Sequence, residues 1–256
     1  MYIDAHCHLD DPKIKDRIEE VVNAFTNENV TKVVNVGCDL DTSILVKDQA
    51  EKFTPVYFAA GFHPMDVDKI SEEGLLGIEK LLTHEKCVAV GEIGLDYYWT
   101  KENVERQKEY FVRQLEIAKA YKLPVNVHVR DATQDALIIL KENKDKLTYG
   151  GVMHCYAGSK ETALELLKLG LHFSFGGTLT FKNARNIPEV MAYLPEDRIL
   201  SETDSPYLSP EPLRGRCNEP KNIPIIVQKM ADIRGVEVEY LAERILKNAK
   251  TLFYKL

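Results

Sequence analysis

Two histidines stand one residue apart near the start of the chain, in the segment MYIDAHCHLD. In a β-strand, side chains at positions i and i+2 point to the same side, so His6 and His8 would present two imidazoles to one face. Two imidazoles placed in this way can bind a single cation, but an isolated His-x-His pair is weak evidence for a metal site. The pattern gains weight only if other ligand-type side chains converge on it.

Further ligand-type side chains follow other apolar runs of the sequence. They are Glu92 in VGEIGLDY, His128 in NVHVRDA, His154 in GVMHCYAG and Asp204 in LSETDSPY. Each stands where a short β-rich run ends, and in a parallel barrel such ends meet at one mouth. Four histidines and two carboxylates buried together without a cation would carry a large desolvation cost. The sequence therefore predicts a metal centre made by these six residues.

Six ligands are too many for one tetrahedral ion, whereas two ions that share a carboxylate account for them. Glu92, at the end of the central strand, is the candidate bridge. The two histidines of the first strand and Asp204 would complete one site, and His128 and His154 the other. Two divalent cations against two carboxylates give a locally positive site, which favours phosphates. The histidines favour Zn2+ or Mn2+, while the hydrolysis of phosphate esters in cells commonly uses Mg2+.

Other residues are candidates for catalysis, for support of the ligands and for substrate binding. Asp204 and Glu92 are the candidate catalytic carboxylates, with Asp204 placed to take a proton from the attacking water. Glu202 and Asp4 are candidate hydrogen-bond partners of a ligating histidine, although a salt link inside the barrel explains each about equally well. The candidate substrate-binding residues are His63 of GFHP, Arg130, and Arg214 and Arg216 of a proline-rich loop.

Aromatic side chains also gather near the ends of the expected strands, where a ring can stack on a nucleobase. They are Tyr97, Tyr98, Trp99, Tyr156 and Tyr207. Most aromatic rings in such runs simply pack, so these residues are weaker candidates than the ligands.

The elements that must position these side chains alternate along the whole chain between β-rich runs and amphipathic helical patterns. Strands are expected at 2–5, 32–36, 56–60, 87–91, 125–129, 150–153, 171–175 and 198–201. Helices are expected at 13–29, 103–122, 131–146, 222–234 and 238–253. The pattern predicts a single (β/α)8 TIM barrel over residues 1–256, with a doubly wound sheet as the alternative. The segment 206–224, which holds five prolines, is expected to be a long ordered loop.

Composition narrows the class of protein. A chain of 256 residues with 45% hydrophobic residues can bury one large core. The net charge of −7 argues against a protein that coats nucleic acid by general attraction. The five cysteines are odd in number and scattered, which is typical of proteins whose thiols stay reduced rather than of a disulfide framework. Without a signal-like or membrane-spanning run, we expect a cytoplasmic protein with no membrane partner, and nothing requires more than a monomer.

Taken together, the motifs resemble those of the TatD family of metal-dependent hydrolases, in the amidohydrolase-like superfamily. The matching segments, in order, are DAHCHLD, GFHP, VGEIGLDYYW, VNVHVRDA, GVMHCYAGS, GGTLTFKNA, ETDSPYLSP and LRGRCNEP. The resemblance covers the whole chain, and the family's ligand positions fall on the six residues above. It implies a dinuclear centre and deoxyribonuclease activity, in a family described as 3′-to-5′ exonucleases that prefer single strands. The family's HSFSG-like segment is HCYAG here, a change beside a ligand that bears on substrate preference.

The resulting prediction is a hydrolase of ester bonds that uses two divalent cations per subunit and acts on single-stranded ends of DNA. One alternative is a deacylase of D-aminoacyl-tRNA, and another is a small-molecule amidohydrolase or esterase. Several such amidohydrolases bridge their metals with a carboxylated lysine, where this chain offers Glu92. A metal-dependent scaffold is the non-enzymatic alternative, for which Glu92→Ala would lose metal without any loss of turnover.

Overall fold

The computed structural model describes all 256 residues, and eight parallel strands form one sheet in chain order. The strands are β1 (Tyr2–Cys7), β2 (Val30–Val36), β3 (Val56–Ala60), β4 (Cys87–Asp96), β5 (Val125–Arg130), β6 (Gly151–Met153), β7 (His172–Phe175) and β8 (Ile199–Ser201). Each overlaps a strand expected from the sequence. The largest difference is β4, which continues beyond Gly91 to include Glu92 and the residues up to Asp96.

The two ends of the sheet meet, so the strands form a nearly closed barrel. The Ser201 hydroxyl donates to the Ile3 carbonyl at 2.9 Å, and the Asp204 amide donates to the His6 carbonyl at 2.9 Å. A doubly wound sheet keeps its edge strands apart, whereas here β8 returns to β1. The (β/α)8 prediction is confirmed and the alternative is excluded.

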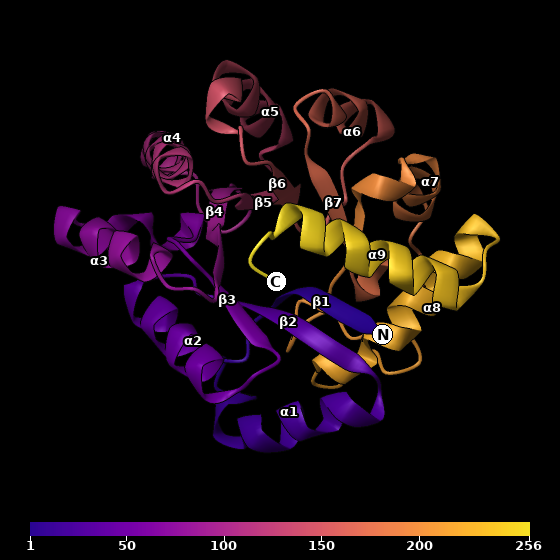
Figure 1. The fold of residues 1–256 in the computed structure, drawn as a ribbon. Helices are drawn as coiled ribbons and strands as arrows, with labels where there is room; N and C mark the ends of the chain where they lie inside the picture. The colour runs from indigo at the N-terminus through magenta and orange to yellow at the C-terminus, as the bar shows by residue number, and fades with distance from the viewer.

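Helices surround the barrel, as Figure 1 shows in a view along its axis. They are α1 (Ile18–Asn27), α2 (Leu40–Lys52), α3 (Glu72–Leu82), α4 (Val104–Tyr121), α5 (Thr133–Glu142), α6 (Lys160–Leu167), α7 (Asn186–Tyr193) and α8 (Ile223–Arg234). Their buried residues recur at helical spacing, as with Phe111, Leu115 and Ala118 of α4, so each helix covers the strands with one apolar face. No helix combines the length and the apolar character that crossing a bilayer needs.

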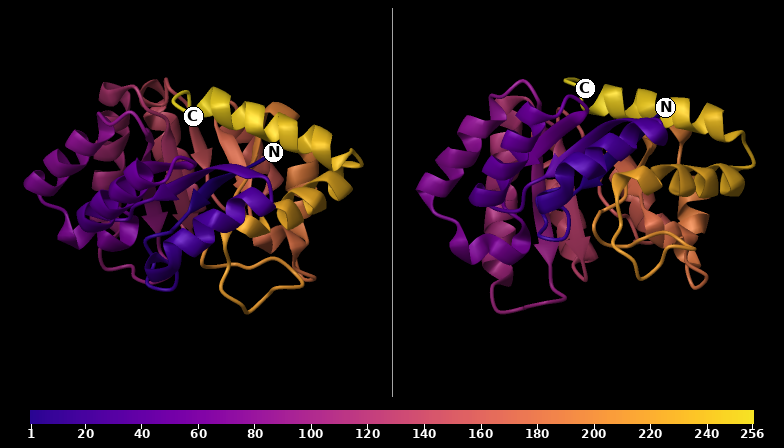
Figure 2. Two further views of the ribbon diagram at one scale, coloured as in Figure 1. Left: turned by 60° about the horizontal axis from the view of Figure 1, so that its bottom comes forward. Right: turned by 90° about the horizontal axis from the view of Figure 1, so that it is seen from below.

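The last helix, α9 (Val238–Leu252), closes the end of the barrel at which the strands begin. Asn248 donates to the Ile199 carbonyl at the start of β8, at 2.9 Å, and Tyr254 donates to the Lys122 carbonyl just before β5, at 2.9 Å. Figure 2 shows α9 along one end of the molecule and the loop 202–219 at the other. The open mouth is therefore at the ends of the strands, where the predicted ligands stand.

One glycine lets β4 and β5 approach each other closely beside the site. Gly94 has φ +141°, and a Cβ there would lie 2.0 Å from the His128 carbonyl oxygen. Any other residue would clash with β5 and is disfavoured at that φ. This close approach places Glu92 on β4 next to His128 on β5.

Candidate metal centre

The six predicted ligands lie together at the mouth of the barrel, on β1, β4 and β5 and within three residues after β1, β6 and β8. His6 is fully buried. The other five line a cavity of about 620 Å3: His8, Glu92, His128, His154 and Asp204. Residues separated by up to 198 positions in the sequence are thus brought to one place, as the sequence pattern predicts.

The first group of donor atoms is formed by His6 of β1, His8 directly after it, and two carboxylates. His6 Nε2 and His8 Nε2 are 3.1 Å apart. Glu92 Oε2 lies 3.5 Å from His6 Nε2 and 3.6 Å from His8 Nε2. Asp204 Oδ1 lies 3.7 and 3.6 Å from the same two nitrogens. Four possible ligand atoms, two nitrogens and two oxygens, therefore face one another.

The second group uses the other oxygen of the same glutamate. Glu92 Oε1 lies 2.8 Å from His128 Nδ1 and 2.9 Å from His154 Nε2, and these nitrogens are 3.1 Å apart. The two oxygens of one carboxylate thus face two different pairs of imidazoles. This is the arrangement that a carboxylate shared by two cations requires.

Hydrogen bonds on the far side of the rings decide which nitrogens carry electron pairs. His8 Nδ1 lies 2.9 Å from the Val36 carbonyl, which can only accept, so the neutral ring turns an unprotonated Nε2 to the site. His128 Nε2 lies 3.0 Å from Asp96 Oδ2, so its unprotonated Nδ1 faces Glu92. Converging electron pairs and carboxylate oxygens repel one another unless a cation lies between them. The donors therefore fit divalent metal ions, with nitrogen and oxygen ligands.

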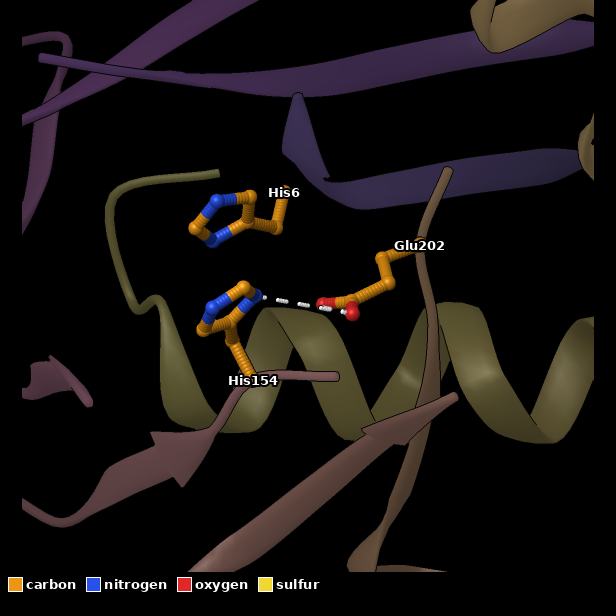
Figure 3. A group of neighbouring side chains, drawn as sticks. All are labelled: His6, His154 and Glu202. Atoms are coloured by element: carbon orange, nitrogen blue, oxygen red, sulfur yellow. Dashed lines mark ion pairs between the residues drawn. The ribbon is translucent and has the colours of Figure 1, made fainter. Parts of the chain in front are cut away.

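Two further side chains support the ligating rings. Figure 3 shows the stacked rings of His6 and His154, whose centroids are 4.0 Å apart, with Glu202 Oε1 at 3.6 Å from His154 Nδ1. Glu202 also accepts from the Cys155 amide at 2.6 Å, so its buried carboxylate is held in place. Asn126 Oδ1 lies 3.1 Å from His6 Nδ1. Such partners fix the orientation of a metal-binding imidazole.

Sequence reasoning missed Asp96 and Asn126, although a signal was present. Asp96 follows Glu92 by four residues on β4, and Asn126 precedes His128 by two residues on β5. Alternation along a strand predicts that each shares a face with a ligand.

The electrostatics of the group show how strongly its members interact. Burial alone would raise the pKa of Glu92, but the imidazoles of His154, His6 and His63 bring it well below its usual value. Burial would likewise lower the pKa of His154, but Glu92 and Glu202 raise it well above its usual value. The surroundings of these rings thus favour positive charge, which protons or metal cations can supply.

The structure places Asp4 elsewhere than predicted. Its side chain does not reach an imidazole; Oδ1 accepts from the His6 amide at 3.2 Å and from the Thr203 amide at 2.9 Å. Asp4 precedes His6 by two residues on β1 and so lies one layer deeper in the barrel. Its carboxylate closes the seam between β1 and the segment after β8, and thereby holds the backbones that carry His6 and Asp204.

His63 differs from the other histidines of the site. Its Nδ1 accepts from the Met65 amide at 3.1 Å, so the neutral ring carries its proton on Nε2. That Nε2 lies 3.8 Å from Glu92 Oε1 and lines the cavity. His63 therefore offers a proton donor to the cavity, where the four ligand histidines offer electron pairs.

Of the three predicted arginines, only Arg130 lines the cavity. Its guanidinium lies 3.7 Å from the centroid of the Tyr98 ring. Arg214 and Arg216 are exposed on the loop 202–219 and do not line the cavity, and Arg214 lies over the Phe181 ring at 4.3 Å. The structure does not bring these two residues to the cavity, because a long loop follows its own packing rather than a strand direction, and their role in binding substrate stays a prediction.

The cavity is more negative than the sequence analysis assumes. Arg130 is its one Lys or Arg, whereas its carboxylates are Asp10, Asp11, Asp66, Glu92, Asp96 and Asp204. With neutral histidines this leaves five negative charges, and two divalent cations would leave one. The expectation of a locally positive site is therefore corrected. An anionic substrate would have to be held by direct contact with the cations and not by the overall field.

Comparison with known proteins identifies the family. The model of the TatD related DNase family matches residues 3–254. The chain is 42% identical over 253 residues to YabD of Bacillus subtilis, described as an uncharacterised metal-dependent hydrolase, with 99% of each chain covered. It is 38% identical to YcfH of Escherichia coli, described in the same words, over 98% of this chain and 95% of that one. The crystal structure of YjjV, a TatD homologue of E. coli, has a TM-score of 0.93 at 32% identity and covers 99% of this chain and 98% of its own. This chain belongs to the TatD family of metal-dependent hydrolases.

Proposed function

We propose that this protein is a divalent-cation-dependent phosphodiesterase that removes nucleotides from the 3′ end of single-stranded DNA. The observation that supports it most is the position of Glu92, whose two oxygens face separate pairs of imidazoles. The description of the matching family as related to a DNase supports the choice of substrate.

Two cations would be held on the two sides of the glutamate. The first would take His6, His8, Asp204 and Glu92 Oε2, and the second would take His128, His154 and Glu92 Oε1. When bound, divalent cations lower the pKa of water and neutralise charge on a phosphodiester. The four imidazoles favour Zn2+ or Mn2+ over Mg2+ at this site.

The protein's own residues would perform the proton transfers. Asp204 lies at the cavity wall beside the Nε2 atoms of His6 and His8, so its carboxylate can accept the proton of the attacking water. The proton on His63 Nε2 points into the same cavity and can be donated to a phosphate oxygen or to the leaving oxygen. Arg130 at the rim can pair with a neighbouring phosphate.

The test follows a 5′-labelled single-stranded oligodeoxynucleotide on a gel, with Mg2+, Mn2+ or Zn2+. We expect a ladder that shortens from the 3′ end, abolished by chelation and by Glu92→Gln. The matched control is Asp197→Asn, which removes an exposed carboxylate at the start of β8, the opposite end of the barrel. Intact DNA with all three cations would contradict the proposal. Aminoacyl-tRNA and small esters would then be the substrates to compare.

A further inference from the structure

The rim of the cavity carries several exposed aromatic and apolar side chains. Four of the large exposed hydrophobic residues also line the cavity that holds the ligands: Met65, Trp99, Tyr207 and Leu208. Trp99 is 63% exposed and Tyr207 is 47% exposed. Large apolar groups left in water around a site rich in carboxylates need a reason, and contact with a ligand supplies one.

The two aromatic rings come from opposite sides of the mouth. Trp99 follows β4 and Tyr207 follows β8, and in an eight-stranded barrel with strands in chain order these positions face each other. Between them lie the carboxylate of Glu92 and the imidazoles that surround it. A substrate bound across the site would meet one ring on each side of the reacting bond.

The other aromatic residues near the strand ends are used within the protein. The Tyr97 hydroxyl donates to Asp135 Oδ2 at 2.9 Å, and the Tyr156 hydroxyl donates to the Ser159 carbonyl at 2.8 Å. Neither ring is exposed. Tyr98 is 54% exposed, but its ring does not line the cavity, and the Arg130 guanidinium lies 3.7 Å from its centroid. Trp99 and Tyr207 are therefore the exposed aromatic rings that line the cavity.

Both available rings are held in place and accompanied by a cation. The Trp99 ring packs edge to face with the Tyr98 ring, with centroids 4.8 Å apart. The Arg130 guanidinium lies 5.5 Å from the centroid of the Trp99 ring. The Tyr207 hydroxyl donates to Asp11 Oδ2 at 2.7 Å, and Lys13 Nζ lies 5.4 Å from the ring centroid. A fixed flat ring beside a positive group matches the flat base and the phosphate of a nucleotide.

The charge of the cavity increases the part that such rings would play in binding. Arg130 is the one Lys or Arg in its lining, so a polyanion gains little from ion pairs with the protein. Proteins that bind single strands combine positive charge along the backbone with aromatic rings on which the bases stack, so with one arginine in the lining the stacking contacts would carry the larger share of the binding. A volume of about 620 Å3 also lies within the range of sites for small ligands.

We propose that Trp99 and Tyr207 stack on the two nucleobases that adjoin the scissile phosphodiester, one on each side of the cation cluster. This inference rests on the proposed function. The recognised unit is then an unpaired dinucleotide, because neither base can stack on a ring while it is paired and stacked in a duplex.

The test measures KM and kcat for Trp99→Ala and Tyr207→Leu on single-stranded DNA. Loss of one stacking contact is expected to raise KM about 5- to 150-fold with a smaller change in kcat. Tyr240→Leu is the matched control, since Tyr240 is also 47% exposed and donates to a carboxylate, Glu196, at 2.9 Å, but lies on α9 at the other end of the barrel. Its KM should stay at the wild-type value, and Trp99→Phe should recover most of the loss at that position.

Abasic oligonucleotides separate stacking from other effects. With the base missing from one of the two nucleotides at the 3′ end, one of the two variants should behave like the wild type, because its ring has nothing to stack on. Unchanged KM in both variants on ordinary DNA would overturn the inference, as would an equal rise in KM with and without the bases. If the wild type cuts no DNA at all, the proposed function fails first, which is a distinguishable result.

Discussion

Replacing Asp96 with asparagine should weaken cation binding through the orientation of one proton. Asp96 Oδ1 accepts from the Tyr98 amide at 2.9 Å, while Oδ2 accepts from His128 Nε2 at 3.0 Å. In Asp96→Asn the amide oxygen will keep the Tyr98 contact, so the NH2 group will face His128. The imidazole must then accept at Nε2 and carry its proton on Nδ1, which points at Glu92 Oε1 from 2.8 Å.

The expected loss of metal affinity follows from the role of Asp96 in orienting His128. Loss of the group that orients a ligating histidine typically costs about 10- to 100-fold in metal affinity, or about 1.4 to 2.8 kcal/mol. Isothermal titration of metal-free protein with Zn2+ or Mn2+ measures it directly. Because Asp96 contacts only the group around Glu92 Oε1, we expect one of the two binding events to weaken and the other to persist.

The control for this prediction is Asp66→Asn. Asp66 lines the same cavity but pairs with Lys69, at 2.5 Å, and with no histidine. The Asp66→Asn substitution removes the same negative charge but leaves the tautomer of His128 unchanged. Equal affinity losses in the two variants would show that only charge matters, and an unchanged affinity in Asp96→Asn would refute the reasoning about the proton.

Three further predictions concern stability. Burial and the nearby Arg198 lower the pKa of His172 to about 4, and neither ring nitrogen has a hydrogen-bond partner. This folded-state pKa lies below the unfolded value of about 6.5. Protonation of His172 therefore costs no stability above pH 6.5, and the free energy of unfolding falls as the pH drops towards 4. In urea titrations with EDTA, the free energy of unfolding of His172→Phe should therefore fall by about 2 kcal/mol less than that of the wild type between pH 7.5 and pH 5. Equal falls in the two proteins would contradict this. Lys86 Nζ donates to the Ala50 and Phe53 carbonyls at 2.6 and 3.0 Å, where α2 ends, so Lys86→Met should cost about 2 kcal/mol in the same assay, and an unchanged urea midpoint would count against that role. Cation at 100 times Kd should add about 2.7 kcal/mol to wild-type stability in thermal melts, whereas the same gain in Glu92→Ala would contradict the assigned site.

Much of the fold was predictable because strands and helices leave local patterns. The eight β-rich runs overlap β1 to β8, and alternation along a strand predicts that His6 and His8 share one face. Glu92 was expected at the end of its strand, whereas β4 continues to Asp96. Local sequence patterns could not distinguish a closed barrel from a doubly wound sheet, because closure depends on contacts between distant residues, such as that between Ser201 and Ile3.

The site was predictable where strands carry it and unpredictable where loops do. Arg130 continues β5 and reaches the cavity, whereas Arg214 lies on a loop whose path depends on contacts such as that with Phe181. Hydrogen bonds behind the ligands, such as that from His8 to the Val36 carbonyl, were also out of reach because they depend on the register of neighbouring strands.

Anomalous diffraction from crystals soaked in Mn2+ would test the central claim most directly. Two peaks are expected, one on each side of the Glu92 carboxylate, with His6 and His8 around the first and His128 and His154 around the second. Glu92→Gln should lower or remove both peaks together. A single peak, or two peaks that do not share Glu92, would contradict the account of one carboxylate shared by two cations.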